Sequence, residues 1–524
     1  MSAPIAIISM LHESASGNSA TRSFQGKPVL SSTLAQVSKI SGVNSAFILC
    51  WDDQSPAVAE AVKALAVDKD ASWCTLACKG RRRAVASLDA IAAAGRWMDG
   101  WRGGLLQSCD FDIGFHGKWI AELVGDRDVL LIDPAAGALD LNLIEKVLDR
   151  SEQRPDLDMV FTQAAPGLCG VLLRSSLLLQ LANADQHPGK LLHYLPDRPS
   201  RDPIAGEACV EVPTEMARTT RHFKLNSIRQ IQRFEDKSSI GSTVQTADCP
   251  RELMLEITTC RSTFPAFGSA KHFPIARPDL TIELAQKIFQ EFGSIDDLRL
   301  TLGGVGDPLC HPNFFEIVES ARAVGITAIH VETDLYELDT AQVAGLVEAG
   351  IDIISVNIPA LTPGTYQKLM GINGYETVIQ NIKQLVLRRQ GLGRGTPIVV
   401  PTFVKCRENF TEMEPWYDQW LKALGTAVIT GPTIFDDASP SLSDMTPPKR
   451  KACARLNHRM TILSDGQIVS CDNDVFARQV LGQIKTETAL KIWNGPASQL
   501  RADHAQGQWQ KHSLCASCKE WYRP

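Results

Sequence analysis

The sequence predicts an α/β protein with two layered α/β regions followed by a small cysteine-rich module. Apolar strand-like runs alternate with segments of helical spacing over residues 1–235 and, more regularly, over 250–432. Four cysteines then gather beyond residue 449. A chain of 524 residues is also too long for one hydrophobic core. We therefore expect domains at residues 1–235, 249–432 and 449–524, joined by polar linkers near 234–247 and 433–448.

The first region opens with a buried-strand pattern and continues with strands and helices in turn. This alternation predicts a mostly parallel sheet covered by helices. The Pro-rich stretch 187–203 is irregular and should end the domain or cross its surface. The strands are expected at residues 5–8, 46–49 and 129–132, and helices at 32–40 and 56–66.

The central region repeats the alternation six times. Six βα units without a closing pair predict a partial (β/α)6 barrel, whose site lies at the carboxyl ends of the strands. The strands are expected at 253–258, 298–302, 328–332, 353–357, 398–403 and 428–430, and helices at 282–292, 314–323, 341–349, 376–389 and 412–424.

The C-terminal module carries Cys453, Cys471, Cys515 and Cys518, spaced C-x17-C and, after a long gap, C-x2-C. The turn 464–466 (Ser-Asp-Gly) is flanked by apolar runs and predicts a β-hairpin that brings Cys453 and Cys471 together. Four soft thiolates at this spacing suit zinc or an iron–sulfur cluster. A zinc ribbon, or four unrelated buried cysteines, is the alternative.

The sequence around these cysteines resembles the SPASM domain, a module that binds an auxiliary iron–sulfur cluster in many radical SAM proteins. The resemblance covers nearly all of residues 449–520, including Ser-Asp-Gly-Gln-Ile-Val-Ser-Cys at 464–471, Leu-Gly-Gln-Ile at 481–484 and Lys-Ile-Trp-Asn at 491–494. It implies that the four cysteines hold one [4Fe–4S] cluster.

Residues 250–432 resemble the radical SAM superfamily through several short motifs in order. They are Leu-Glu-Ile-Thr-Thr-Cys at 255–260, Gly-Gly-Val-Gly-Asp-Pro at 303–308 and Ser-Val-Asn-Ile-Pro at 355–359. That family needs C-x3-C-x2-C on the loop after the first strand, to hold a cluster that cleaves S-adenosylmethionine. Here the three positions are Cys260, Phe264 and Phe267. Phenylalanine cannot donate electrons to iron, so we expect no such cluster on this loop.

Two explanations of the altered loop compete. Either the domain is a degenerate scaffold without radical chemistry, or other cysteines are recruited to bind a differently ligated metal. Cys260 and Cys310 would share one end of the sheet, whereas Cys249 precedes the first strand and should lie at the opposite end. All three could also be small buried hydrophobic residues.

The Gly-rich turn of the radical SAM family is retained at Gly303, Gly304, Gly306 and Asp307. By resemblance this turn lies near the amino group of S-adenosylmethionine, with Asp307 where glutamate is usual. It implies that the central domain can bind S-adenosylmethionine without cleaving it. A tight βα turn that needs glycine for its backbone angles is the alternative.

Residues 4–50 resemble sugar-nucleotide cytidylyltransferases of the GT-A-like fold. The matching features are the strand at 5–9, the Gly-Lys-Pro at 26–28 and Asp133 after a later strand. The resemblance implies that Lys27 and Asp133 belong to a nucleotide site, with Asp133 as a Mg²⁺ ligand. The loop 12–23 has few basic residues, which weakens the prediction of triphosphate binding.

Composition excludes several classes of protein. The net charge is −6 and no basic block is present, so nucleic acid and anionic membranes are not expected partners. No stretch approaches the roughly 18–20 apolar residues of a membrane span, and the N-terminus lacks a signal peptide. Fourteen cysteines without an export signal favour a reducing cytoplasm. A small-molecule or sugar-nucleotide substrate fits these properties.

Three functions remain open. The chain is an iron–sulfur protein of radical SAM/SPASM type with a role in sugar-nucleotide or surface-polysaccharide metabolism, a catalytically degenerate binding or scaffold protein, or a radical SAM enzyme with unusual cluster ligation.

Overall fold

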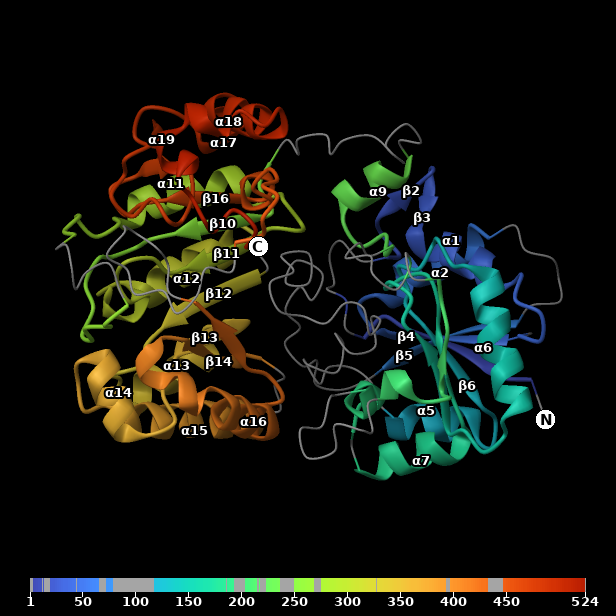
Figure 1. Ribbon diagram of the computed structural model, residues 1–524. Coiled ribbons are helices and arrows are strands. Elements are labelled where there is room, and N and C mark those ends of the chain that lie inside the picture. The colour runs from blue at the N-terminus through green and yellow to red at the C-terminus, as the bar shows by residue number, and fades with distance from the viewer. Residues whose placement is uncertain are drawn as a thin grey trace. The chain divides into compact units, whose positions relative to one another are not determined.

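The computed structural model describes two compact units, which we treat separately (Figure 1). The first unit comprises residues 1–92 and 97–242, and the second comprises residues 93–96 and 243–524. The residues described are 3–11, 13, 19–43, 45–65, 72–78, 117–184, 186–192, 203–213, 216, 223–235, 249–267, 275–326, 328–392, 396–431 and 446–523.

The first unit is built on a seven-stranded sheet in the order β5-β4-β1-β6-β8-β7-β9. Strand β1 pairs in parallel with β4 on one side and β6 on the other, whereas β8 runs antiparallel to both of its neighbours. The strands are β1 (Ile5–Ser9), β4 (Ser45–Trp51), β5 (Ser72–Cys78), β6 (Val129–Ile132), β7 (Met159–Thr162), β8 (Val171–Leu173) and β9 (Cys209–Val210), and a separate ribbon joins β2 (Ser23–Phe24) to β3 (Lys27–Pro28).

Helices pack on the apolar side chains of this sheet and bury two main clusters. One includes Ala6, Ile8 and Leu34, and the other includes Ile5, Ile7 and Leu178, so alternate residues of β1 face opposite layers. The helices are α1 (Val29–Val37), α2 (Ser55–Lys63), α5 (Gly117–Val124), α6 (Leu141–Gln153), α7 (Ser175–Ala184) and α9 (Ile228–Glu235), with 3₁₀ turns at Pro188–Leu192 and Pro203–Ala205.

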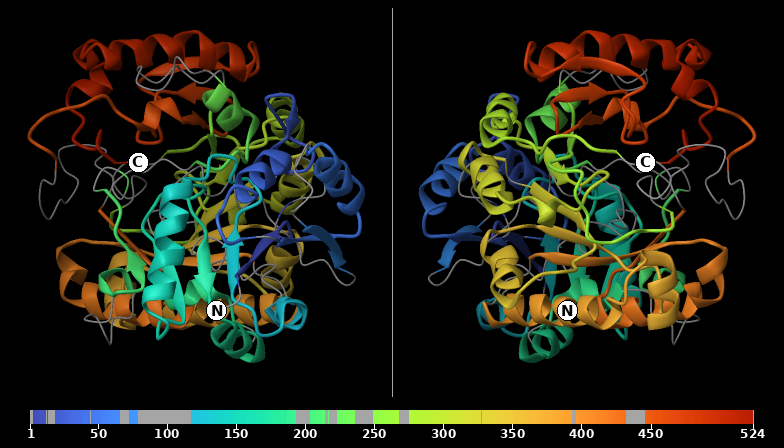
Figure 2. Two further views of the ribbon diagram at one scale, coloured as in Figure 1. Left: turned by 90° about the vertical axis from the view of Figure 1, so that its right-hand side faces the viewer. Right: turned by 90° about the vertical axis from the view of Figure 1, so that its left-hand side faces the viewer.

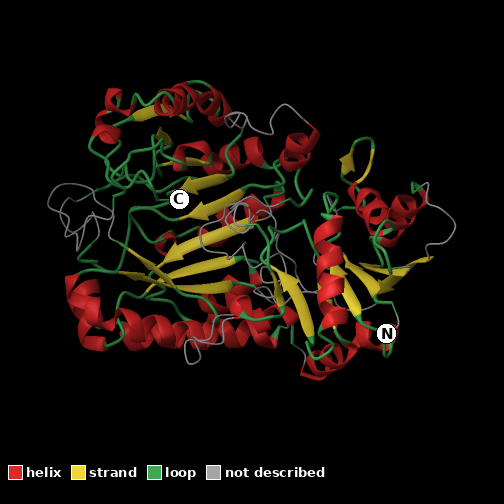
Figure 3. Ribbon diagram, turned by 45° about the vertical axis from the view of Figure 1, so that its right-hand side comes forward, coloured by secondary structure: helices red, strands yellow, loops and turns green. Residues whose placement is uncertain are grey.

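The second unit contains a nine-stranded sheet whose first six strands follow one another in sequence order and run parallel (Figure 3). This agrees with the six βα units predicted from the sequence. The six strands are β10 (Glu252–Leu255), β11 (Arg299–Leu302), β12 (Ala328–Thr333), β13 (Ile353–Asn357), β14 (Ile398–Val404) and β15 (Val428–Thr430).

Helices cover the outward side chains of these strands. Leu253 and Leu255 of β10 join Ile288 and Phe289 of α11 in the main core cluster. Thr281 and Thr362 cap α11 and α14 through their side chains, which accept the backbone N–H groups of Leu284 and Thr365. The helices are α11 (Ile282–Phe292), α12 (Phe314–Ala323), α13 (Thr340–Glu348), α14 (Pro363–Met370), α15 (Tyr375–Gly391) and α16 (Met413–Leu424), with 3₁₀ turns at Pro308–Cys310 and Arg407–Glu412.

The cysteine-rich module continues the central sheet. Strand β16 adds in parallel to β10, with Glu252 opposite Arg459 and Leu255 opposite Ile462, and β17 and β18 follow antiparallel. Figure 2 shows the module at the red end of the chain, with its helices beside these strands. Its elements are β16 (Arg459–Ile462), β17 (Gln467–Val469), β18 (Val480–Gln483), α17 (Ala489–Asn494), α18 (Pro496–Ala505) and α19 (Ser513–Ala516), with 3₁₀ turns at Arg455–Asn457 and Trp509–Lys511.

Most predicted elements of the central region are confirmed within two residues, except for β10. Its hydrogen-bonded strand ends at Leu255, whereas we expected it to reach 258, because the chain leaves the ladder to form the loop that carries Cys260. The first helix of the chain also differs from the prediction: it spans 29–37 and not 32–40. Pro28 is its N-cap, and the fixed φ of proline (−54° here) suits the residue that starts a helix. The hairpin at 464–466 is confirmed by the pairing of β16 with β17.

The three-domain division stays a prediction, as do the GT-A-like and partial-barrel descriptions. No helix in the described residues is long and apolar enough to cross a membrane.

Candidate functional site

The four cysteines of the C-terminal module lie in one neighbourhood. Cys453 precedes the 3₁₀ turn before β16, Cys471 follows β17, and Cys515 and Cys518 flank the end of α19. Cys453 and Cys515 pack with Leu456, Leu500 and Trp509 in a small apolar cluster. Cys453 also interacts electrostatically with Cys471, and these are the two cysteines that the β16–β17 hairpin was predicted to bring together.

Burial raises the pKa of three thiols of the module, those of Cys453, Cys471 and Cys515. Burial raises the pKa of Cys515 to about 12, and the neighbouring thiols of Cys518 and Cys453 add to the increase. Burial also raises the pKa of Cys471, with further contributions from Asp472 and, more weakly, Cys453. A metal would have to displace these protons, so metal affinity at this site should rise with pH.

Two arginines offer positive charge beside the thiols. Arg450 donates from Nη2 to the carbonyl oxygen of Cys515 at 2.6 Å and stacks over the ring of Trp509 at 4.9 Å. Arg455 is buried, and it interacts electrostatically with Cys453 and Cys471. An anionic thiolate site would be compensated by these guanidinium groups.

The donor set fits an iron–sulfur cluster better than a preformed ion site. The backbone N–H of Glu520 points to Sγ of Cys518 at 3.3 Å, a contact typical of hydrogen bonding to a cluster-bound sulfur. Across the described ranges, no three His, Cys, Asp or Glu side chains are gathered tightly enough to hold a metal ion as they stand. Soft thiol donors, an apolar shell and nearby cations are nevertheless the surroundings that an anionic cluster needs.

The loop after β10 is fixed by hydrogen bonds from protein groups. The N–H groups of Phe264 and Ala266 donate to the carbonyl oxygens of Met370 and Leu369, at 2.8 and 2.7 Å. Thr263 Oγ1 donates to Asp334 in a short hydrogen bond. The Phe264 side chain is 66% exposed, so the position of the family's second cysteine faces solvent.

The Gly-rich turn after β11 packs against Glu256 and the loop of Cys260. A Cβ on Gly306 would lie 2.4 Å from the carbonyl oxygen of Thr258, and Gly304 has φ +122° beside the Glu256 side chain. Arg277 donates to both carboxylate oxygens of Glu256 at 2.7 Å. Close backbone approach therefore explains these glycines without a ligand.

Asp307 and Asp334 form a buried pair of carboxylates at the carboxyl ends of β11 and β12. The Asp307 carboxylate accepts the N–H groups of Leu309 and Asp334 and the hydroxyl of Thr333, at 2.8–3.0 Å. Burial, followed by the charge of Asp334, raises the pKa of Asp307 to about 6. Both carboxylate oxygens of Asp307 thus already accept hydrogen bonds from protein groups. The binding of S-adenosylmethionine at this turn stays a prediction.

The remaining predicted cysteines are divided between the two ends of the sheet. Cys260 and Cys310 lie close to each other at the carboxyl ends of β10 and β11, where burial raises the pKa of Cys310 to about 11 and Cys260 contributes to the increase. The hydroxyl of Ser262 lies 3.7 Å from Cys310 Sγ. Cys249 lies on the amino side of β10, as expected.

The predicted residues of the N-terminal site have different surroundings. Asp133 follows β6, and its two oxygens accept the Ala135 N–H at 2.9 Å and pair with the Lys224 ammonium at 2.8 Å. Lys27 lies exposed on β3. Sequence reasoning missed Lys224, whose ammonium already supplies a cation to the carboxylate proposed as a Mg²⁺ ligand. Of the predicted phosphate loop 12–23, residues 12 and 14–18 lie outside the described residues.

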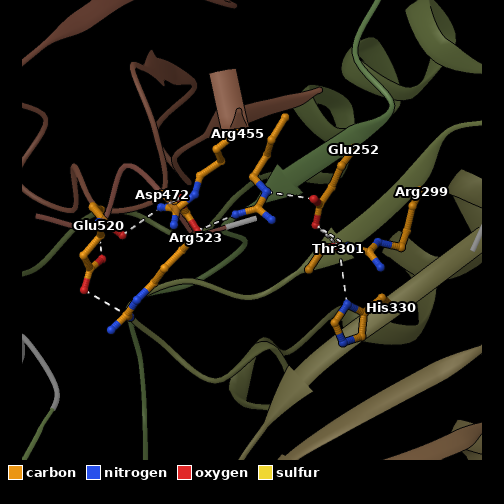
Figure 4. A network of polar contacts seen from close by, with 10 residues as sticks. Glu252, Arg299, Thr301, His330, Arg455, Asp472, Glu520 and Arg523 are labelled. Atoms are coloured by element: carbon orange, nitrogen blue, oxygen red, sulfur yellow. Dashed lines mark hydrogen bonds and ion pairs between the residues drawn. The ribbon is translucent and has the colours of Figure 1, made fainter. Parts of the chain in front are cut away.

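A chain of buried ion pairs joins the central strands to the cysteine module (Figure 4). Arg299 and Arg459 donate to different oxygens of Glu252, at 2.8 and 2.7 Å. Arg459 and Arg455 then donate to the two oxygens of Asp472, the residue after Cys471, at 2.7 and 2.8 Å. We call these five residues the arginine ladder.

Sequence analysis did not identify the arginine ladder. A signal was present, because Glu252, Arg299 and Arg459 are each the first residue of a largely apolar strand, where charge is rarely buried without a partner. The periodicity of the sequence does not indicate which of these charged residues form ion pairs.

Two family models match the second unit. Residues 262–401 match the radical SAM superfamily, and residues 453–519 match SPASM, an iron–sulfur cluster-binding domain. These two segments of the chain are thus similar to a radical SAM domain and to a SPASM domain, in that order. At the level of the family, these domains imply iron–sulfur clusters and S-adenosylmethionine as cofactors.

Curated relatives match parts of the chain. An uncharacterized protein of Treponema pallidum is 21% identical over 43% of this chain and 64% of its own length. The tungsten-containing aldehyde ferredoxin oxidoreductase cofactor-modifying protein of Pyrococcus furiosus is 24% identical over 37% and 57%. A probable GTP 3′,8-cyclase of Metallosphaera sedula is 31% identical over 25% and 38%. The chain thus spans less than two thirds of the length of these relatives.

Solved structures show a weaker likeness. Streptococcus suis SuiB bound to S-adenosylmethionine is 11% identical, with a TM-score of 0.40, and the match covers 52% of this chain and 73% of that one. BtrN in complex with AdoMet and 2-DOIA is 13% identical, with a TM-score of 0.35 and coverage of 53% and 94%.

Proposed function

We propose that this protein binds one [4Fe–4S] cluster in its SPASM domain, through Cys453, Cys471, Cys515 and Cys518. The observation that carries the proposal is the gathering of four thiols beside two arginines in a segment that matches a cluster-binding domain. The cluster would serve as an electron carrier or as a structural element. Arg450 and Arg455 would compensate its charge, and the packing of Leu456, Leu500 and Trp509 would limit contact with water.

We propose further that the radical SAM domain carries no cluster on the loop 260–267. Phe264 and Phe267 stand where thiolates are needed, and the loop is held by hydrogen bonds to Asp334, Leu369 and Met370. S-adenosylmethionine binding without cleavage, at the turn 303–307, is part of this proposal. The alternatives are a scaffold that binds no S-adenosylmethionine and a radical SAM enzyme whose cluster is ligated by other residues.

Anaerobic reconstitution tests these proposals together. About four irons and four sulfides per chain are expected, and both should be lost in a Cys515→Ala/Cys518→Ala variant. About eight irons, with about four surviving in the variant, would place a second cluster in the radical SAM domain and overturn the cluster-free proposal. Zinc without iron would overturn the SPASM cluster. Formation of 5′-deoxyadenosine from S-adenosylmethionine would identify a cleaving enzyme.

For the N-terminal unit we propose a nucleotide-binding role in sugar-nucleotide or surface-polysaccharide metabolism. The sheet order places β4 and β5 on one side of β1 and β6 on the other, and ligands of open α/β sheets bind where the order reverses. Asp133 lies at the carboxyl end of β6 beside that point. CTP-dependent release of pyrophosphate, with and without Mg²⁺, tests this role. A cytoplasmic location stays a prediction.

A further inference from the structure

The arginine ladder contains more positive than negative charge. Arg299, Arg459 and Arg455 alternate with Glu252 and Asp472, so three guanidinium groups share two carboxylates. The exposed fraction of each of the three arginine side chains is at most 7%. Because arginine stays protonated in proteins, the ladder carries one buried positive charge that its own carboxylates do not balance.

The nearby groups of the module do not remove this excess. Glu520 pairs with Arg523 at 3.1 Å, which adds one charge of each sign. The buried carboxylate of Asp474 carries a negative charge, but it is held by the backbone N–H groups of Arg478 and Gln479, at 2.8 and 2.7 Å, and within the described ranges it does not pair with an arginine of the ladder. An unbalanced buried cation is costly unless an anion lies close to it.

An anion could best balance the excess positive charge near Arg455, the arginine of the ladder that lies beside the cysteines. Arg455 lies two residues from Cys453, and its partner Asp472 follows Cys471 directly. Arg455 Nε is buried, and among the described residues it meets no hydrogen-bond acceptor. Protonated thiols are neutral and cannot balance the charge, whereas metal-bound thiolates are anionic.

We propose that Arg455 is the counter-cation of the four-thiolate site and sets the reduction potential of the cluster bound there. The inference rests on the proposed function, because the anion is the thiolate-bound cluster. Adding an electron makes that cluster more negative, so a buried cation beside it favours the reduced form. Removing the cation should lower the potential, and removing the Asp472 carboxylate should raise it.

The test is a potentiometric titration of the reconstituted full-length chain, with dithionite as reductant and the electron paramagnetic resonance signal as readout. Arg455→Met should lower the equilibrium constant for reduction about tenfold, which is about 59 mV for one electron. Arg455→Lys should stay close to wild type. Asp472→Asn should shift the potential in the opposite direction.

Arg501→Met is the matched control. Arg501 is a buried arginine of the same module that stacks on Trp493 at 4.0 Å and donates to its carbonyl oxygen, and no cysteine contributes to the shift in its pKa. The reduction potential of the cluster in Arg501→Met should equal that in the wild-type protein.

The outcomes separate this inference from the proposed function. Equal potentials in wild type and Arg455→Met, both with full iron content, would overturn the role of Arg455 and leave the cluster in place. Shifts of the same sign in Arg455→Met and Asp472→Asn would also overturn it. Loss of iron in Arg455→Met alone, with iron retained in Arg455→Lys and Arg501→Met, would support it. No iron in the wild type would overturn both proposals.

Discussion

Glu252 on β10 accepts a hydrogen bond from Arg459 on β16 at 2.7 Å, although the two residues are 207 positions apart in the sequence. Both side chains are almost fully buried, and Arg299 holds the second oxygen of the carboxylate. This contact joins the cysteine-rich module to β10 of the central sheet. Leu253 and Leu255 of β10 also lie in one core cluster with Met460 and Ile462 of β16, so the module and the central strands share one core.

Glu252→Gln should destabilise the second unit strongly. The substitution leaves two buried guanidinium groups without their shared charge, which costs about 3–5 kcal/mol of unfolding free energy. Chemical denaturation followed by circular dichroism measures the loss. Glu348→Gln is the control, because Glu348 pairs with Arg388 at the surface, with side chains 51% and 46% exposed, and should change stability by at most about 1 kcal/mol. Equal effects at both sites would contradict the importance of the ladder.

Asp307→Asn should change how stability depends on pH. The pKa of Asp307 is about 6 in the folded protein and near 3.8 as its ordinary value, so between these values the folded state binds more protons than the unfolded state. Wild-type stability should consequently fall as pH rises from about 4 to 6, by about 3 kcal/mol for this group.

The asparagine variant lacks this titration. Unfolding free energies of wild type and variant, measured from pH 4 to 7, should therefore differ in slope, with the variant gaining relative to wild type as pH rises. Parallel curves would show that Asp307 titrates normally. The lost hydrogen bonds would shift the whole curve and leave its slope unchanged.

Gly306→Ala should lower the free energy of unfolding of the second unit by about 1–3 kcal/mol. The new Cβ would lie 2.4 Å from the carbonyl oxygen of Thr258 and 2.6 Å from that of Cys260, so the loop would have to move. Gly364→Ala is the matched control in α14, where nothing lies within 4 Å of the added Cβ, and it should change stability by less than about 1 kcal/mol. A tolerated Gly306→Ala would mean that this loop yields easily. Thermal unfolding distinguishes the two results.

Phe264→Cys/Phe267→Cys should supply the two missing thiols and add about four irons per reconstituted chain. Phe264 is 66% exposed, so its replacement removes little packing, whereas Phe267 contributes part of its side chain to the core. Iron analysis measures the gain, and Phe264→Ser/Phe267→Ser is the control without thiols. If the cysteine variant gains no iron, the hydrogen bonds of Thr263, Phe264 and Ala266 hold the loop in a form that excludes a cluster.

The sequence by itself determined most elements of the central region and the place of the cysteine module, but only some elements of the first unit. Apolar periodicity and capping are local, so helices such as α11 and α12 and strands such as β13 and β15 were predicted at their observed bounds. The Ser-Asp-Gly turn likewise specified the hairpin between β16 and β17, because Gly466 adopts φ +88° there.

The tertiary structure alone decided how the charges are paired. A strand pattern does not identify the neighbouring strand. The parallel addition of β16 to β10 brings Arg459 to Glu252, whereas the β16–β17 hairpin brings Asp472 to Arg455. In the same way Lys224 reaches Asp133 only through the folding of segments far apart in the chain. A buried charge needs a partner of opposite charge, and that partner often comes from a distant segment of the chain. The local sequence around a charged residue does not indicate which segment supplies it.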